Sequence, residues 1–121
     1  MKSEIQCLAL ASLFVAVGTQ FVQAQQPALG RPLTSSWTST DTGNSMSNFR
    51  ARVAGGQCVA QMNYKTRDGY AGQTQWVFAA VPQGDHTRCT NGQWQDLSGS
   101  GRTGSVNDII VYKGKFYWAQ R

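Results

Sequence analysis

The sequence predicts an all-β protein, a small antiparallel sandwich or barrel of about six or seven short strands. After residue 25, no stretch of useful length has apolar residues at helical spacing. Runs rich in β-branched and aromatic residues lie instead between glycine and asparagine residues that favour turns. Two pairs of these runs flank tight turns, at Gly55-Gly56 and at Lys113-Gly114, as expected for antiparallel hairpins.

The first 24 residues have the parts of an export signal. Lys2 stands near the start, an apolar run fills residues 7–17, and Ala24 ends a short segment with small or aliphatic residues where a signal peptidase reads them. The apolar run is too short to cross a bilayer, which takes about 20 residues. We therefore expect residues 1–24 to be a cleaved signal peptide and the protein to be secreted, with no membrane span.

The remainder of the 121-residue chain is expected to form one domain. Residues 25–33, with prolines at 27 and 32, predict a flexible lead-in, and residues 34–121 predict a single β domain. A short first strand is expected around Trp37, followed by turn residues at 41–44. Because Lys2 and Glu4 cancel, the formal net charge of +5 belongs to the part that follows the signal.

The first hairpin has a two-residue glycine turn whose register agrees with the apolar alternation. In that register Arg50 and Arg52 lie together on the opposite face of the hairpin from the apolar residues. The expected pairs are Val53 with Cys58, Ala51 with Ala60, Phe49 with Met62, and Ser47 with Tyr64.

The second half of the chain predicts further strands in a regular order. Residues 73–81 are mostly apolar on both faces and predict a central strand, stopped by Pro82. An eleven-residue loop is expected at 82–92, a short strand at 93–97 and a glycine-rich loop at 98–105. A final hairpin is expected from 106–112 and 115–119. It pairs Val111 with Phe116, Ile109 with Trp118, and Ile110 with Tyr117.

The cysteines predict one disulfide. Cys7 lies in the expected signal, which leaves Cys58 and Cys89, and an isolated pair in an oxidising compartment forms a bridge. Cys58 and Cys89 are 31 positions apart. Closing a loop of this length stabilises a fold by about 3 to 4 kcal/mol in the chain-entropy model. Neither sulfur then remains as a nucleophile or a metal ligand, and we expect no metal and no cofactor.

Few residues are suited to catalysis, and we expect no enzyme. His86 is the single histidine, and no glutamate follows Glu4. Asp85 is too close in sequence to orient His86, which leaves Asp96 or Asp108 as partners. The glycines at 99, 101 and 104 formally match a nucleotide-binding pattern, but no helix follows them, so this segment is interpreted as a loop.

Aromatic and arginine side chains are the better binding candidates. An exposed tryptophan beside glutamines suits a sugar, which stacks on the ring and bonds to the amides; the alternative is that alternation turns the tryptophans into the core. Clustered arginines on a body of charge +5 favour anionic partners, and the alternative is an ordinary solubilising surface. The candidate ligand-binding residues are Trp94, Arg50, Arg52, Tyr70, Arg88, Arg102 and Trp37.

Two short stretches resemble known families. Trp37 to Met46, WTSTDTGNSM, is similar to the opening strand of avidin-like barrels. Val106 to Trp118 resembles the end of cyanovirin-type lectin repeats, in which an acidic and apolar run precedes a glycine turn and an aromatic residue. Neither resemblance assigns a binding residue, and no family is recognised over the length of the chain. As a class, small cationic secreted β-proteins with one disulfide resemble effectors and protein inhibitors.

Three functions are compatible with these features. The first is a secreted, non-catalytic interaction module, effector-like or inhibitor-like, that binds an extracellular protein or an anionic or neutral polysaccharide. The second is a glycan-binding lectin that uses Trp94 and Trp37 as platforms. The third is a small ribonuclease-like toxin that uses His86, an aspartate and Arg88, although nucleic acid is the less expected partner.

Overall fold

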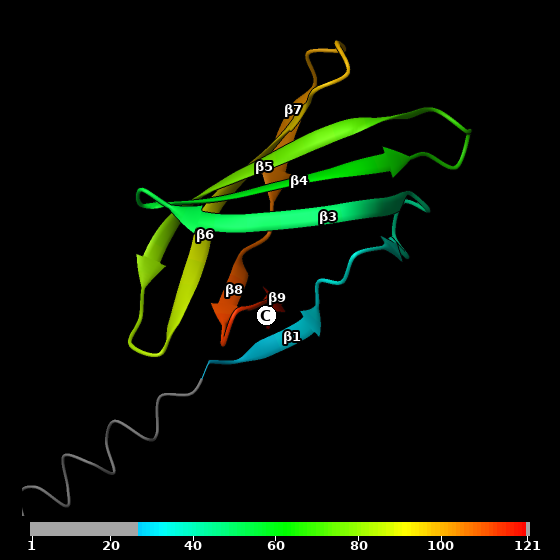
Figure 1. Ribbon diagram of the computed structural model, residues 1–121. Helices are drawn as coiled ribbons and strands as arrows, with labels where there is room; N and C mark the ends of the chain where they lie inside the picture. Colours follow the sequence, from blue (N-terminus) through cyan, green and yellow to red (C-terminus); the bar gives the residue numbers. More distant parts are fainter. Residues whose placement is uncertain (1–26, 121) are drawn as a thin grey trace, which may run out of the picture.

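The computed structural model describes residues 27–120 and shows an antiparallel, all-β protein built on one curled sheet (Figure 1). The expected signal peptide at 1–24 lies outside the described residues. Within them, no helix is long and apolar enough to cross a membrane. The strands are β1 (Leu29–Pro32), β2 (Trp37–Thr38), β3 (Ser45–Ala54), β4 (Gln57–Lys65), β5 (Ala71–Pro82), β6 (His86–Asp96), β7 (Thr103–Val106), β8 (Ile109–Tyr112) and β9 (Lys115–Ala119).

The all-β expectation is confirmed, but the described residues contain nine strands rather than six or seven. Their order across the sheet is β1-β9-β8-β6-β5-β4-β3-β2, and β7 also pairs with β6. Two strands form where loops were expected: β1 lies within the expected lead-in, and β7 begins in the expected glycine-rich loop and ends at Val106. Each of these two strands has four residues and, among the described residues, pairs with one neighbour only, β1 with β9 and β7 with β6. Strands this short contain little of the apolar alternation that marks a longer strand.

The β3–β4 hairpin has the expected register near its turn and a different register further away. Val53 pairs with Cys58 and Ala51 with Ala60, as expected, but Ser47 pairs with Asn63 rather than with Tyr64. The shift arises at a β-bulge where Asn48 and Phe49 together face Met62, and Asn48 has a left-handed φ of 55°. The apolar alternation alone does not reveal this additional residue.

Strand β6 is longer than expected and absorbs most of the predicted 82–92 loop. Only Gln83, Gly84 and Asp85 connect β5 to β6, and Pro82 pairs with Thr87. The expected central strand is confirmed as β5, which lies between β4 and β6. The first half of β6 is polar, and it forms a strand because β5 and β8 both supply backbone partners for it.

On the side away from β5, β6 pairs with two strands. Its first half pairs with β8 and its second half with β7, and residues 107–108 separate these two neighbours. The final hairpin has the register that the sequence predicts: Val111 pairs with Phe116, Ile109 with Trp118, and Ile110 with Tyr117.

The segment that holds β1 and β2 contacts both ends of the curled sheet. Strand β1 pairs with β9, and the Leu33 amide donates to the Phe116 carbonyl at 2.8 Å. A few residues later the Ser35 carbonyl accepts a hydrogen bond from the Phe49 amide at 3.1 Å, and β2 pairs with the start of β3. In Figure 1, β1 lies beside the lower strands β8 and β9, and β3 and β4 lie above them.

The core fills the inner side of this curl. The disulfide between Cys58 and Cys89 joins β4 to β6, with a Cα–Cα distance of 6.0 Å, and both cysteines are buried. Phe78 and Ile109 are also fully buried beside it, and burying side chains of this size stabilises a fold by about 1.5 to 3 kcal/mol each. The expected disulfide is confirmed. We call the side of the sheet that carries the two sulfurs the inner face and the other side the outer face.

Candidate functional site

The outer face of β3 to β6 carries a row of polar side chains at directly paired positions. Arg50, Gln61, Gln75 and Gln95 stand opposite one another on the four strands. Nη2 of Arg50 donates to Oε1 of Gln61 at 3.4 Å, and Nε2 of Gln61 donates to Oε1 of Gln75 at 2.8 Å. These hydrogen bonds hold the arginine and two of the amides in one line across the sheet.

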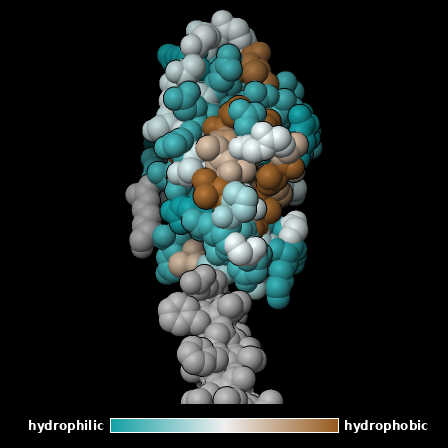
Figure 2. Space-filling model, turned by 90° about the vertical axis from the view of Figure 1, so that its left-hand side faces the viewer, coloured by the Kyte–Doolittle hydropathy of each residue, from teal (hydrophilic) through white to brown (hydrophobic). Residues whose placement is uncertain are grey.

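Beside this row lies an apolar group that we call the valine–alanine patch. The alternation of β4 and β5 buries Cys58, Trp76 and Phe78 and turns the residues between them outward. Figure 2 looks at the side where the β3–β4 turn and the end of β5 lie, and it shows hydrophobic residues gathered in the middle of a hydrophilic surround. The patch consists of Ala54, Val59, Val77, Ala79 and Val81.

Positive charge borders the valine–alanine patch. Arg52 pairs with Val59 on one side, and Arg88 pairs with Val81 on the other. In the described part of the chain, no outer-face position of β3 to β6 carries an acidic side chain. Arg88 has an acidic partner outside these four strands, because its Nε donates to Oδ2 of Asp108 at 2.9 Å. Arg52 makes no side-chain hydrogen bond to a described residue.

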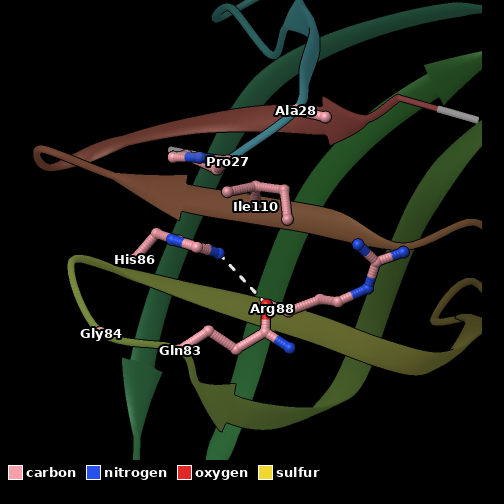
Figure 3. Close-up of a pocket in the computed structure, with 7 residues that line it drawn as sticks. All are labelled: Pro27, Ala28, Gln83, Gly84, His86, Arg88 and Ile110. Carbon is pink, nitrogen blue, oxygen red and sulfur yellow. Dashed lines mark hydrogen bonds between the residues drawn. The ribbon is translucent and has the colours of Figure 1, made fainter. Parts of the chain in front are cut away.

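Next to Arg88 is an open hollow of about 580 Å³, lined by residues of the β5–β6 turn, β6, β8 and the start of the described chain (Figure 3). The side chain of His86 is only 10% exposed there. Its Nδ1 lies 2.8 Å from Oδ1 of Asp85, and its Nε2 lies 3.1 Å from Oε1 of Gln83. The expectation that Asp85 is too close to orient His86 is wrong, because the turn bends the Asp85 carboxylate back onto the ring.

The two aspartates expected as alternative partners of His86 have other contacts. Asp108 bonds to Arg88, and Asp96 accepts hydrogen bonds from Tyr64 and from the backbone of Ser98 and Ser100. Among residues 27–120, no group of three or more histidine, cysteine or acidic side chains is placed to hold a metal ion.

Both candidate tryptophan platforms lie on the inner face. Trp37 packs edge to face on Phe49, with ring centroids 5.5 Å apart, and also contacts Trp76. Trp94 pairs with Trp76 across the strands, packs against the core, and lies so close to Gly104 that a Cβ there would collide with the indole. Of the two interpretations of the tryptophans, the placement agrees with the one in which alternation turns the rings inward.

Tyr70 and Arg102 lie at the other end of β5, away from the β5–β6 turn. Tyr70 is 57% exposed, and its ring stacks on that of Tyr64, with centroids 6.4 Å apart. The Tyr64 hydroxyl donates to Oδ1 of Asp96 at 3.2 Å, and the Asp96 amide donates to the carbonyl of Arg102. Asp96 thus holds the β6–β7 turn against β4 and β5.

Burial and hydrogen bonding shift the pKa values of Tyr64 and Asp96. Hydrogen bonds from Ser100 and Ser98 hold the pKa of the Asp96 carboxyl below its usual 3.8. Burial, with the hydrogen bond to Asp96, raises the pKa of the Tyr64 hydroxyl above its usual 10.0. The contact between Tyr64 and Asp96 was not predicted from the sequence, although an aspartate with serines two and four positions later is a signal for such a turn.

The structure therefore brings together three of the seven candidates. Arg50, Arg52 and Arg88 share the outer face, whereas Tyr70 and Arg102 lie at the opposite end of the molecule and the two tryptophans face the core. The valine–alanine patch was not predicted from the sequence. Its signal is the run 73–81, apolar on both faces, which indicates a buried strand or, as here, an apolar outer surface.

No protein-family model, no curated protein and no solved structure matches this chain.

Proposed function

We propose that this chain is a secreted, non-catalytic interaction module that binds an extracellular protein through the outer face of β3 to β6. The observation that carries the proposal is the valine–alanine patch with its border of arginines and amides. Apolar patches rimmed by polar residues on small soluble proteins mark sites of protein–protein contact. Arginine is enriched in such interfaces, and acidic residues are depleted from their centres.

The chemistry of the surface supports a protein ligand of complementary shape and negative charge. Val81 is 40% exposed at the edge of the patch, and Arg52 and Arg88 stand on either side of the patch. Covering the patch removes apolar area from water, while the arginines favour encounter with an anionic surface. The outer face of β3 to β5 is a strand surface, so it offers this contact without the ordering cost of a loop.

A matched pair of variants tests the proposal. Val81 and Leu97 are both exposed aliphatic residues, 40% and 44% exposed. Val81 lies near the end of β5, whereas Leu97 follows β6 and donates its amide to Gln73 near the start of β5. Val81→Asp places a charge in the patch, and Leu97→Asp places the same charge away from it. Wild type and both variants are applied to arrayed extracellular proteins and to arrayed glycans, at low salt and at about 0.5 M salt.

We expect the wild type and Leu97→Asp to bind the same protein ligand and Val81→Asp to bind it at least about tenfold more weakly. Equal binding by the wild type and both variants overturns the assignment of the outer face. Binding that is lost equally in both variants also overturns it, because the loss then follows the added charge and not the patch.

Glycan binding is the second candidate, favoured by the hydrogen-bonded amide row of Gln61 and Gln75. Amide side chains in a line can bond to successive sugar hydroxyls. The two tryptophans proposed as stacking platforms pack against the core, so this candidate depends on the amides. It predicts glycan binding that persists at about 0.5 M salt and is weakened by Gln75→Ala, with Val81→Asp binding as the wild type does.

A further inference from the structure

Strand β3 has a backbone edge that no described residue pairs with. Strand β2 pairs only with Ser45 and Met46, and the Ser35 carbonyl accepts from the Phe49 amide. Beyond that point β3 runs from Arg50 to Ala54 with β4 on one side only. Such an edge presents unpaired N–H and C=O groups, on which another extended chain can pair.

The hairpin geometry identifies the backbone groups at this edge. In a two-residue hairpin the residues that flank the turn, here Ala54 and Gln57, form a hydrogen-bonded pair, and such pairs alternate along the strand. Arg52 and Arg50 therefore bond to β4, whereas Ala51 and Val53 direct their N–H and C=O groups to the open side. The hydrogen bond from the Phe49 amide to the Ser35 carbonyl agrees with this alternation, since Phe49 lies two residues before Ala51 and its amide points to the same side.

The side chains along this edge favour an acidic partner over a second copy of the chain. Arg50 and Arg52 lie on the outer face of β3, next to where an added strand would place its own outer-face side chains. Antiparallel pairing of two copies along β3 would set these arginines against their counterparts, and opposed like charges destabilise a strand pair. An added strand with glutamates at alternate positions would form opposite-charge pairs instead. Its apolar residues would lie beside Ala51 and Val53, of which Val53 is 42% exposed.

We propose that β3 binds an extended acidic segment of the protein partner by strand addition along Arg50 to Ala54. This proposal rests on the proposed function and specifies how part of the partner is held. Backbone hydrogen bonds to Ala51 and Val53 provide the register, and Arg50 and Arg52 select for negative charge. The contact continues the valine–alanine patch, since Ala54 belongs to the patch and ends this edge.

The test uses a synthetic, fluorescently labelled peptide with alternating glutamate and valine and blocked ends. One matched peptide carries N-methyl groups on the amides that would face β3, and another has lysine in place of each glutamate. On the protein side, Val53→Pro removes an edge N–H, and Val53→Thr retains it. Proline is tolerated at positions that do not donate within a sheet, so Val53→Pro is expected to fold, as checked by its melting curve.

We expect the acidic peptide to bind the wild type and Val53→Thr, with affinity that falls as salt rises. Binding should weaken about tenfold or more for the N-methylated peptide, for Val53→Pro and for Arg52→Gln, and should be absent for the lysine peptide. A second matched substitution, Ala51→Pro against Ala51→Ser, repeats the test at the other edge residue should Val53→Pro not fold.

Three outcomes overturn strand addition. Binding that survives N-methylation and both proline variants shows attraction by charge without backbone pairing. No binding of the acidic peptide to the wild type removes the site, and concentration-dependent dimerisation blocked by Val53→Pro assigns the edge to a second copy. In each case the Val81→Asp and Leu97→Asp comparison still decides the proposed function independently, because Val81 lies on the face of β5 and not on the β3 edge.

Discussion

Asn48 and Asn91 adopt the same left-handed backbone conformation, with φ of 55° and 53°, in two β-bulges. Asn48 lies on β3 and Asn91 on β6, on either side of the hairpin that β4 and β5 form. The bulge at Asn48 and Phe49 faces Met62, and the bulge at Asn91 and Gly92 faces Phe78. Each bulge adds one residue to its strand and increases the local twist and bend. The two together help the sheet to curl around the buried Met62 and Phe78.

Asn91→Val should destabilise the fold, because a β-branched residue resists positive φ. The left-handed conformation costs an ordinary L-residue about 1 to 2 kcal/mol, and asparagine tolerates it better than most. We expect the free energy of unfolding in urea to fall by about that amount, while Asn91→Gly stays within about 0.5 kcal/mol of the wild type. Equal stability of the valine and glycine variants would show that the bulge is absent in solution.

Gly92→Ala should collide with the ring of Phe78. A Cβ built at Gly92 meets that ring and lies 2.9 Å from the carbonyl oxygen of Val106. Overpacking of this kind costs about 1 to 3 kcal/mol. Adding Phe78→Leu removes the ring, so the double variant should lose less stability than the sum of the two single variants. Simple additivity in this double-mutant cycle would contradict the contact.

Cys58→Ser combined with Cys89→Ser should lower the free energy of unfolding by about 3 to 4 kcal/mol. The bridge closes a loop between residues 31 positions apart, and both cysteines are buried in the core. Thermal denaturation under non-reducing conditions measures the effect, and wild type treated with reductant is the control. An unchanged melting curve for the double variant would mean that the bridge contributes nothing to stability.

Gly55→Val should disrupt the β3–β4 turn. Gly55 and Gly56 have φ of 60° and 77°, which both central residues of this turn type require. Nothing crowds a Cβ at Gly55, so the expected loss of about 1 to 2 kcal/mol is due to backbone conformation alone. Gly55→Asn is the matched control and should retain most of the stability in the same urea titration.

The low pKa of Asp96 makes stability depend on pH in acid. A carboxyl group with a lower pKa in the folded than in the unfolded protein stabilises the fold above the unfolded value, here 3.8, and loses this effect as pH falls through the folded value. Asp96→Asn should therefore be less stable than the wild type at pH 7, with a difference that shrinks below about pH 4. Urea midpoints measured from pH 7 to pH 2 check this. A constant difference would mean that Asp96 does not titrate differently in the two states.

The hairpins and the disulfide were predictable because their information is local or compositional. Gly55-Gly56 and Lys113-Gly114 specify turns, and the alternation beside each turn agrees with one register. Two cysteines after the expected signal allow one pairing. The Asn48 bulge was not predictable, since it depends on how Phe49 reaches both the core and the carbonyl of Ser35.

The candidate site was predictable only in part. Arg50 and Arg52 could be placed on one face because they stand two apart on a strand, but their proximity to Val77 and Ala79 required the order β3-β4-β5. The contact between His86 and Asp85 was not predictable. It depends on the three-residue turn between β5 and β6, where the sequence predicted an eleven-residue loop.

By itself the amino-acid sequence determined the class of the fold, the two tight turns, the cross-link and the excess of positive charge, since each depends on neighbours in the chain or on composition. The tertiary structure alone decided which strands lie side by side, and hence that arginines and valines from β3 to β6 share a surface while Trp37 and Trp94 face the core. The physical reason is that pairing between distant strands is chosen by the collective packing of the core, a quantity that no local stretch of residues contains.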